Sequence, residues 1–311
     1  MKIKLLSTII AGVILAGCGS DNNNTVTPEV KAKDVQAYDG AVNGMVATYD
    51  CEGETVATTK AKTDGKGYVT ITNNTFADNP EKCAVSLTVP KGGKAYDMSN
   101  SKDMSNVSYS IPKGLLESGR KAAATPFTTL VDKAIKDSGE TNSENVDIDS
   151  IINDVFTGLG IDTSVVDPKD LMCSPAETLE TLDATVAQDI VAKTMVLSDV
   201  LVANPEQELS DITTVTKTIA KDIIDKNPDF PTQTIAGSKK PIYVDLTDEL
   251  ADENTFKEAA SGKVPTDIAE ATKPENIVVG EVLDPVNPPV DPTPDAPTGG
   301  TGGDDGDNPN G

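Results

Sequence analysis

Short stretches in which apolar and polar residues alternate predict β-strands between residues 30 and 112. The clearest are rich in β-branched side chains, and a turn-forming run, Asp64-Gly65-Lys66-Gly67, precedes one of them. The stretches lie at residues 41–49, 68–72, 84–89 and 107–111. With about six or seven strands expected in such a length of chain, we predict a small antiparallel β-sandwich over residues 30–112.

From residue 113 the apolar positions follow the helical period of about 3.6 residues. Thr125 followed by Pro126 predicts a helix start, and Ser174, Pro175 and Glu177 indicate a capping box that opens a helix running to about Ala203. The helix that follows Thr125 includes the apolar positions of residues 127–135, and further helices are expected at residues 148–159 and 209–225. We therefore predict a mainly α-helical, bundle-like domain over residues 113–279, and a multidomain β + α fold class.

Residues 280–311 are rich in Pro, Gly and Asp and contain neither Lys nor Arg. Such a composition offers too few apolar side chains to offset the entropy lost on ordering. We predict a disordered C-terminal tail over this range.

The beginning of the chain has the pattern of an export signal. Lys2 and Lys4 flank an apolar run at residues 5–16 that is too short for a bilayer, which requires roughly 20 apolar residues. Cleavage is the better interpretation, and a polar tether is expected over residues 18–29.

The stretch Leu15-Ala16-Gly17-Cys18 resembles the lipobox of bacterial lipoproteins. The resemblance implies removal of residues 1–17 as a signal peptide, and a diacylglyceryl group and an N-acyl chain on Cys18, which together hold a protein at a membrane. Gly19 replaces the Asp that retains such proteins in the inner membrane. For a Gram-negative host this implies the outer membrane; whether the chain faces the cell surface or the periplasm stays open.

Two further resemblances concern the folded part. Residues 39–46 and 63–69 resemble the carboxypeptidase-regulatory-like, immunoglobulin-like modules of bacterial surface proteins. Residues 125–131 and 151–160 are similar to stretches of uncharacterised Gram-negative lipoproteins in which a helical part follows such a module. These resemblances imply a spacer or binding fold without catalysis.

The amino-acid composition limits which functions the chain can have. The net charge is −24, and loss of Lys2 and Lys4 with the signal peptide would make it −26, which argues against nucleic-acid binding. The chain has no His, so Ser-His-Asp catalysis and imidazole zinc sites are excluded. No phosphate loop or nucleophile elbow occurs either. We expect no enzyme activity, no catalytic residues and no cofactor other than the covalent lipid.

An acidic group at Glu144, Asp147 and Asp149 raises the question of a Ca²⁺ site. Since the group lacks the Gly and distal Glu of an EF-hand loop, we interpret it as a helix-start charge cluster and predict no metal site.

Three cysteines remain after Cys18 is assigned to lipid. Cys51 and Cys83 both lie in the predicted β-sandwich, and we expect them to form a disulfide. Cys173 is then left over, either as a buried thiol or as a site for an intermolecular disulfide.

Together these patterns predict a lipid-anchored, non-enzymatic protein of the cell envelope. It would present interaction surfaces to protein partners in adhesion, receptor contacts or envelope assembly. The alternative is a ligand-binding or hydrolytic periplasmic lipoprotein with a carboxylate-lined site in or beside the helical domain.

Overall fold

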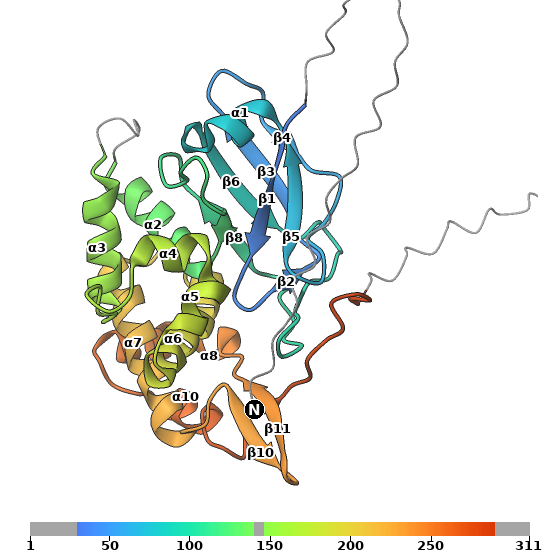
Figure 1. The fold of residues 1–311 in the computed structure, drawn as a ribbon. Coiled ribbons are helices and arrows are strands. Elements are labelled where there is room, and N and C mark those ends of the chain that lie inside the picture. The colour runs from blue at the N-terminus through green and yellow to red at the C-terminus, as the bar shows by residue number, and fades with distance from the viewer. Residues whose placement is uncertain (1–29, 140–145, 290–311) are drawn as a thin grey trace, which may run out of the picture. The chain divides into compact units, whose positions relative to one another are not determined.

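The computed structural model describes residues 30–139 and 146–289 (Figure 1). Within these residues the chain forms twelve β-strands and ten α-helices, so the β + α class is confirmed. The predicted signal peptide, tether and lipidated Cys18, together with Glu144 and residues 290–311, lie outside the described residues.

Two sheets dominate the first part of the described chain. The three-stranded sheet has the order β5-β1-β9, with β1 antiparallel to β5 and parallel to β9. The four-stranded sheet has the order β4-β3-β6-β8 and is antiparallel throughout. The strands are β1 (Ala32–Ala37), β3 (Val46–Cys51), β4 (Ala57–Thr58), β5 (Tyr68–Thr72), β6 (Cys83–Thr88), β8 (Ser108–Ile111) and β9 (Ala123–Ala124).

Burial in these strands follows the period of two that the sequence pattern predicts. In β6 every second side chain is buried, including Cys83, Val85 and Leu87. Cys83 lies opposite Cys51 of β3, with their Cα atoms 4.1 Å apart, and a disulfide joins them, consistent with the predicted pairing. The bond links two neighbouring strands at one end of the sheet.

Smaller elements complete this part. They are β2 (Val42–Asn43), which pairs with β7 (Tyr96–Asp97), the helix α1 (Asn74–Asp78) and a 3₁₀ turn (Pro80–Lys82). Asn73 begins α1 by accepting a hydrogen bond from the backbone N–H of Phe76.

The helices begin largely where the sequence predicts. Thr125 caps α2 (Pro126–Asp137) in a reciprocal capping box with Thr128, and Asp147 caps α3 (Ile148–Gly158) by accepting from the N–H of Ser150. The other helices of this part are α4 (Pro168–Cys173), α5 (Pro175–Thr181), α6 (Ala184–Ala203) and α7 (Leu209–Lys226).

The single helix predicted from Ser174 to Ala203 is wrong. The Ser174 side chain makes no capping hydrogen bond, and the backbone turns extended at Leu182 and Asp183 before α6 begins. Asp183 occupies the N-cap position of α6, although its side chain also makes no capping hydrogen bond, and a second helix begins after it.

The last described part contains a hairpin and three short helices. Strand β10 (Thr232–Ile235) pairs with β11 (Ser238–Tyr243), which also pairs with β12 (Val278–Val279). The helices are α8 (Thr247–Ala251), α9 (Glu253–Ala260) and α10 (Thr266–Ala271).

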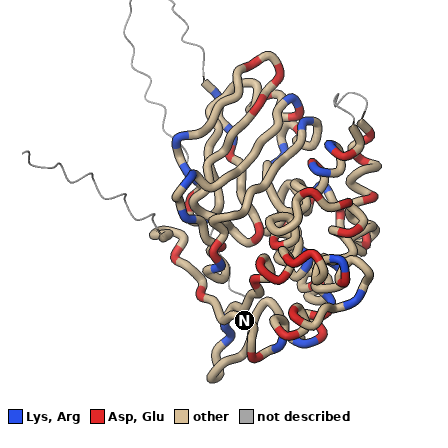
Figure 2. The backbone as a smooth tube through the Cα atoms, turned by 180° about the vertical axis from the view of Figure 1, so that it is seen from behind, with Lys and Arg blue, Asp and Glu red and all other residues tan. Residues whose placement is uncertain are grey.

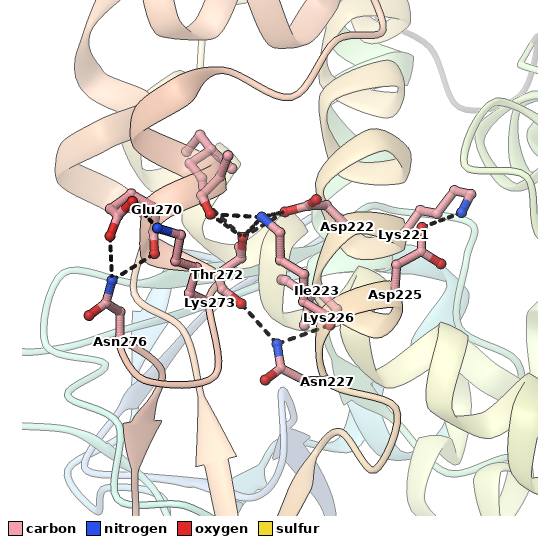
Figure 3. Close-up of polar contacts among 12 residues, drawn as sticks. Lys221, Asp222, Ile223, Asp225, Lys226, Asn227, Glu270, Thr272, Lys273 and Asn276 are labelled. Carbon is pink, nitrogen blue, oxygen red and sulfur yellow. Dashed lines mark hydrogen bonds and ion pairs between the residues drawn. The ribbon is translucent and has the colours of Figure 1, made fainter.

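Polar contacts fasten α10 to the end of α7 (Figure 3). The Lys226 ammonium donates to Asp222, to the Ala269 carbonyl and to the hydroxyl of Thr272, at 2.7 to 2.8 Å. Asn227 donates its amide to the carbonyl of Thr272 at 2.9 Å. These bonds satisfy the backbone carbonyls at the end of α10.

One hydrophobic cluster runs through both the sheets and the helices. At the junction, α2 packs on β8, where the N–H of Ser110 donates to the Thr129 hydroxyl and the Ser110 hydroxyl donates to Asp132. The order of a β-sandwich followed by a helical bundle, with a boundary at residues 112 and 113, stays a prediction.

The described chain continues beyond residue 279 along the β part. Backbone N–H groups of Gly280, Glu281 and Leu283 donate to the carbonyls of Pro241, Asn100 and Met98 respectively. The disordered tail over residues 280–311 stays a prediction.

Charges are interspersed over the described chain (Figure 2). Several acidic side chains pair with Lys one helical turn away, as in Lys133–Asp137, Lys136–Asp132 and Lys257–Glu253. None of the described helices combines the length and the apolar run that a membrane span requires.

Candidate functional site: a pocket beside a buried carboxyl cluster

A pocket of about 400 Å³ lies where loops of the β part meet α5, α6 and the β10–β11 hairpin. Its size is within the range of small-molecule sites. Most of its described lining is apolar. Its polar residues include Asp39, which lies in the turn after β1. The lining residues are Tyr38, Asp39, Gly40, Ser99, Asn100, Leu179, Val191, Thr194, Met195, Pro231, Thr232, Lys239, Pro241, Ile242 and Val282.

A tight turn after β1 brings Asp39 to this place. Tyr38 and Ala41 form a β-bridge across it, and Gly40 has a φ of +83°. A Cβ at position 40 would overlap the Asp97 carboxylate, so both the backbone angle and the close approach require Gly. The turn at Asp39 and Gly40 therefore lies in close contact with Asp97 and with the loop that follows β7.

Asp97 organises that loop. One carboxylate oxygen accepts from the N–H and the hydroxyl of Ser99, at 2.8 and 2.7 Å, and the other accepts from the amide of Asn100 at 2.7 Å. Burial raises the pKa of Asp97 to about 6, although these hydrogen bonds favour the charged form. The loop is therefore held in shape by a carboxyl that titrates above the usual range of Asp.

An ion pair lies beneath the loop, with both side chains only 3% exposed. The Lys102 ammonium donates to Asp199 of α6 at 2.5 Å, and the other oxygen of Asp199 accepts from the N–H of Leu246 at 3.0 Å. Burial opposes the charge of Lys102, but attraction to Asp199 and Asp39 outweighs it and raises the lysine pKa. The pair ties the β part to α6 and to the start of α8.

The pKa of Asp199 is also raised, because burial outweighs the attraction of Lys102. A raised pKa favours the charged form of Lys102 but the neutral form of Asp199. We take the pair as ionised because both the ammonium and a backbone N–H donate to the carboxylate. A buried pair of this kind fixes geometry more reliably than it adds stability.

Asp39 is the member of the cluster that lines the pocket. Its Oδ2 accepts from the Tyr109 hydroxyl at 3.2 Å, and Tyr109 shares a further hydrogen bond of 2.9 Å with Ser198 of α6. Its Oδ1 is buried and has no hydrogen-bond partner among the described residues. Burial, reinforced by the nearby charge of Asp97, raises the pKa of Asp39 well above its usual value.

The arrangement can remove an apolar ligand from water. In the part of the chain that the structure describes, no group of three or more Cys, Asp or Glu side chains is arranged to hold a metal ion. A second, wider pocket of about 720 Å³ has six carboxyl side chains in its lining, from α8, from α10 and from the segments before α8 and α9.

The residues singled out from the sequence do not come together at the pocket. Cys51 and Cys83 form their disulfide in the four-stranded sheet, and Asp147 and Asp149 serve as a helix cap and as a partner of Lys169. Cys173 is a buried thiol whose pKa is raised by burial, against the nearby charge of Arg120. Its role in an intermolecular disulfide stays untested.

Sequence reasoning missed the residues that make the site. In the sequence, Asp39 is only the first residue of the stretch 39–46 that carries the resemblance to a regulatory-like module, and no pattern singles out Lys102. Asp199 carried a signal, because it interrupts the apolar run from Met195 to Val202 in a helix that is otherwise buried there. A charged residue on a buried helix face indicates a partner, although the sequence does not say which one.

Comparison of the chain with protein-family models, with curated proteins and with solved structures gave no match in any of the three.

Proposed function

We propose that this chain is a lipid-anchored, non-enzymatic protein of the cell envelope that binds a small, largely apolar ligand in the pocket beside Asp39. The observation that carries the proposal is the pocket itself. It has a suitable volume and mainly apolar walls, and Asp39 is among its lining residues.

The proposal keeps the architecture predicted from the sequence. An immunoglobulin-like sandwich would be followed by a helical bundle, with Cys18 as the anchor and the outer membrane as the location. Residues of the strand-rich part and of the helices line the pocket, and junctions of this kind are common places for ligand sites. A binding role without catalysis accords with a sequence that contains no His.

Exposed valines favour a second candidate, the presentation of an interaction surface to a protein partner. Val278, Val279, Val282 and Val286 are all exposed, the last two by 72% and 82%. Val282 also lines the pocket, so a partner on this segment would cover the pocket's edge. Apolar side chains in such a row are typical of contact surfaces.

The test uses the mature chain with Cys18→Ser, which removes the lipid and its micelles, and the uncharged fluorophore N-phenyl-1-naphthylamine. We expect saturable binding with enhanced fluorescence, because the pocket would shield the dye from water. Met195→Trp fills the pocket from α6 and should abolish binding. Val202→Trp places the same side chain on the same helix beside a different pocket and serves as the matched control.

Equal dye binding by the two Trp variants would show that the dye does not bind in this pocket. Absence of saturable binding to the parent chain, with capture of a protein partner that Val282→Asp abolishes, would favour the second candidate instead.

A further inference from the structure

A further apolar pocket lies directly beside the pocket at Asp39. It has a volume of about 510 Å³, and its walls come from the first half of α6 and from the loop between α7 and β10. Val191 and Pro231 line both pockets, so the two are neighbours that share these side chains as a wall. We call them the Asp39 pocket and the Ala187 pocket. The remaining lining residues of the Ala187 pocket are Ala184, Thr185, Ala187, Gln188, Pro228, Asp229 and Phe230.

The shared wall is apolar and incompletely buried. Both Val191 and Pro231 are only partly buried, although α6 and the β10–β11 hairpin enclose this region. A ligand that passes along the wall would remove its remaining apolar surface from water, which is favourable. The two pockets therefore offer one continuous apolar path to a ligand that is long enough.

Gln188 holds the loop of the Ala187 pocket against α6. Its side-chain amide donates to the carbonyls of Pro228 and Phe230, at 2.7 and 2.8 Å. The N–H of Phe230 donates to the carbonyl of Asn227 at 2.9 Å, and the Phe230 side chain is buried. Both sides of the pocket are thus fixed in the free chain, as is usual for ligand sites.

The charges on the two pockets differ. Lys239, on the exposed part of β11, lines the Asp39 pocket and has no ion-pair partner among the described residues. The exposed Asp229 lines the Ala187 pocket, whose described lining contains neither Lys nor Arg. A negative group on a ligand is therefore favoured at the first pocket and disfavoured at the second.

The carboxyl of Asp39 opposes this placement only weakly. Burial raises its pKa well above the usual value, so Asp39 keeps its proton to a higher pH than an exposed Asp does. Lys239 is then the charged side chain that decides which end of a ligand lies in the Asp39 pocket.

We propose that the two pockets together bind one long-chain fatty acid. Its carboxylate lies at the Lys239 side of the Asp39 pocket, and its alkyl chain runs past Val191 and Pro231 into the Ala187 pocket. The assignment rests on the proposed function and adds the chemical class of the ligand and its course. A compact ligand would fill one pocket and leave the apolar walls of the other in water, whereas an unbranched chain can follow both.

The experiment measures the binding of octanoate, decanoate and tetradecanoate to the mature Cys18→Ser chain by isothermal titration at pH 7, below their micelle concentrations. Each further methylene that enters a pocket should tighten binding by up to about fourfold. We expect the affinity to keep rising from decanoate to tetradecanoate, because the longer chain reaches the Ala187 pocket. An affinity that levels off at decanoate would mean that the chain stays in one pocket.

Ala187→Trp fills the Ala187 pocket from α6 and leaves the Asp39 pocket open. This variant should bind octanoate as the parent does and lose the gain from decanoate to tetradecanoate. Ala203→Trp adds the same side chain to the same helix, lines neither pocket and should keep the gain. If Ala187→Trp fails to fold, the series of chain lengths on the parent still decides the case.

Charge reversal at Lys239 tests the position of the carboxylate. Lys239→Glu should weaken the binding of all three acids by at least about twofold, since it replaces an attraction by a repulsion at an exposed site. Lys240→Glu is the matched control, because successive side chains of a strand point to opposite faces. Equal weakening by both variants would contradict the placement of the carboxylate at Lys239.

A gain from decanoate to tetradecanoate that persists in Ala187→Trp, or an affinity that levels off in the parent, would overturn the fatty acid and leave the proposed function standing. Saturable binding of the naphthylamine dye without binding of any of the three acids would do the same. Failure of the dye and of all three acids would count against both proposals.

Discussion

The two ends of the β part are held together in different ways. At one end of the four-stranded sheet, a disulfide joins Cys51 and Cys83 on adjacent strands. At the pocket, residues from distant parts of the chain meet through buried charges, with Lys102 and Asp199 separated by 97 positions. The first contact fixes a local pairing, whereas the second joins the β part to the helices. We infer that the disulfide serves the sheet and that the charges position the site.

Removal of one charge should have the largest effect on stability. Asp199→Ala leaves the Lys102 ammonium buried without its partner, which costs about 3–5 kcal/mol in the free energy of unfolding. Urea denaturation of the mature chain measures the loss. The double variant Lys102→Met with Asp199→Leu should recover most of it, because apolar residues of similar volume avoid the unpaired charge.

A loss below about 1 kcal/mol in Asp199→Ala, as for exposed ion pairs, would contradict the buried pair as a fixed element of the site.

Loss of the disulfide should lower the free energy of unfolding by as much as Asp199→Ala or somewhat less. It should leave ligand binding in the pocket unchanged. The bond closes a loop with a sequence separation of 32, worth roughly 3–4 kcal/mol in the chain-entropy estimate. The variant with Cys51→Ala and Cys83→Ala should show that loss in urea denaturation, yet bind the naphthylamine dye with unchanged affinity. Loss of dye binding in the folded variant would mean that the two ends are coupled.

The pH dependence of stability should show the smallest effect and come from the pocket end. The pKa of Asp97 is raised to about 6 in the folded chain, so the native state binds more protons than the unfolded state between about pH 4 and 6. Stability should therefore be highest at the low end of this window and fall as the pH rises through 6, by on the order of 2 kcal/mol.

Asp39 should add to that fall, since its pKa is also raised, so Asp39→Asn should make the curve shallower. Exposed carboxyls with lowered pKa values, such as Asp162 and Asp252, act in the opposite direction but titrate below this window. A flat curve between pH 4 and 7 would contradict the buried carboxyl cluster.

The difference between the disulfide end and the pocket end also explains which features the sequence could predict. Helix starts at Thr125 and Asp147 depend on neighbouring residues, and the period of two in β6 is visible in the chain itself. The Cys51–Cys83 pair could be proposed because two cysteines fell in one predicted β region. All of these are local signals.

The site was beyond such signals because its residues meet only after folding. Nothing near Asp39 in the sequence points to Tyr109 or Ser198, and nothing near Lys102 points to Asp199. The hydrogen bonds of residues 280–283 could not be predicted for the same reason, since their acceptors are the backbone carbonyls of Met98, Asn100 and Pro241, which are distant in the sequence.

A crystal structure of the mature chain with N-phenyl-1-naphthylamine would test the central claim, that the pocket binds a small apolar ligand, most directly. The account predicts the aromatic rings of the dye in the pocket lined by Val191, Met195 and Ile242. A pocket filled only by water at saturating dye, or a dye bound elsewhere, would contradict it.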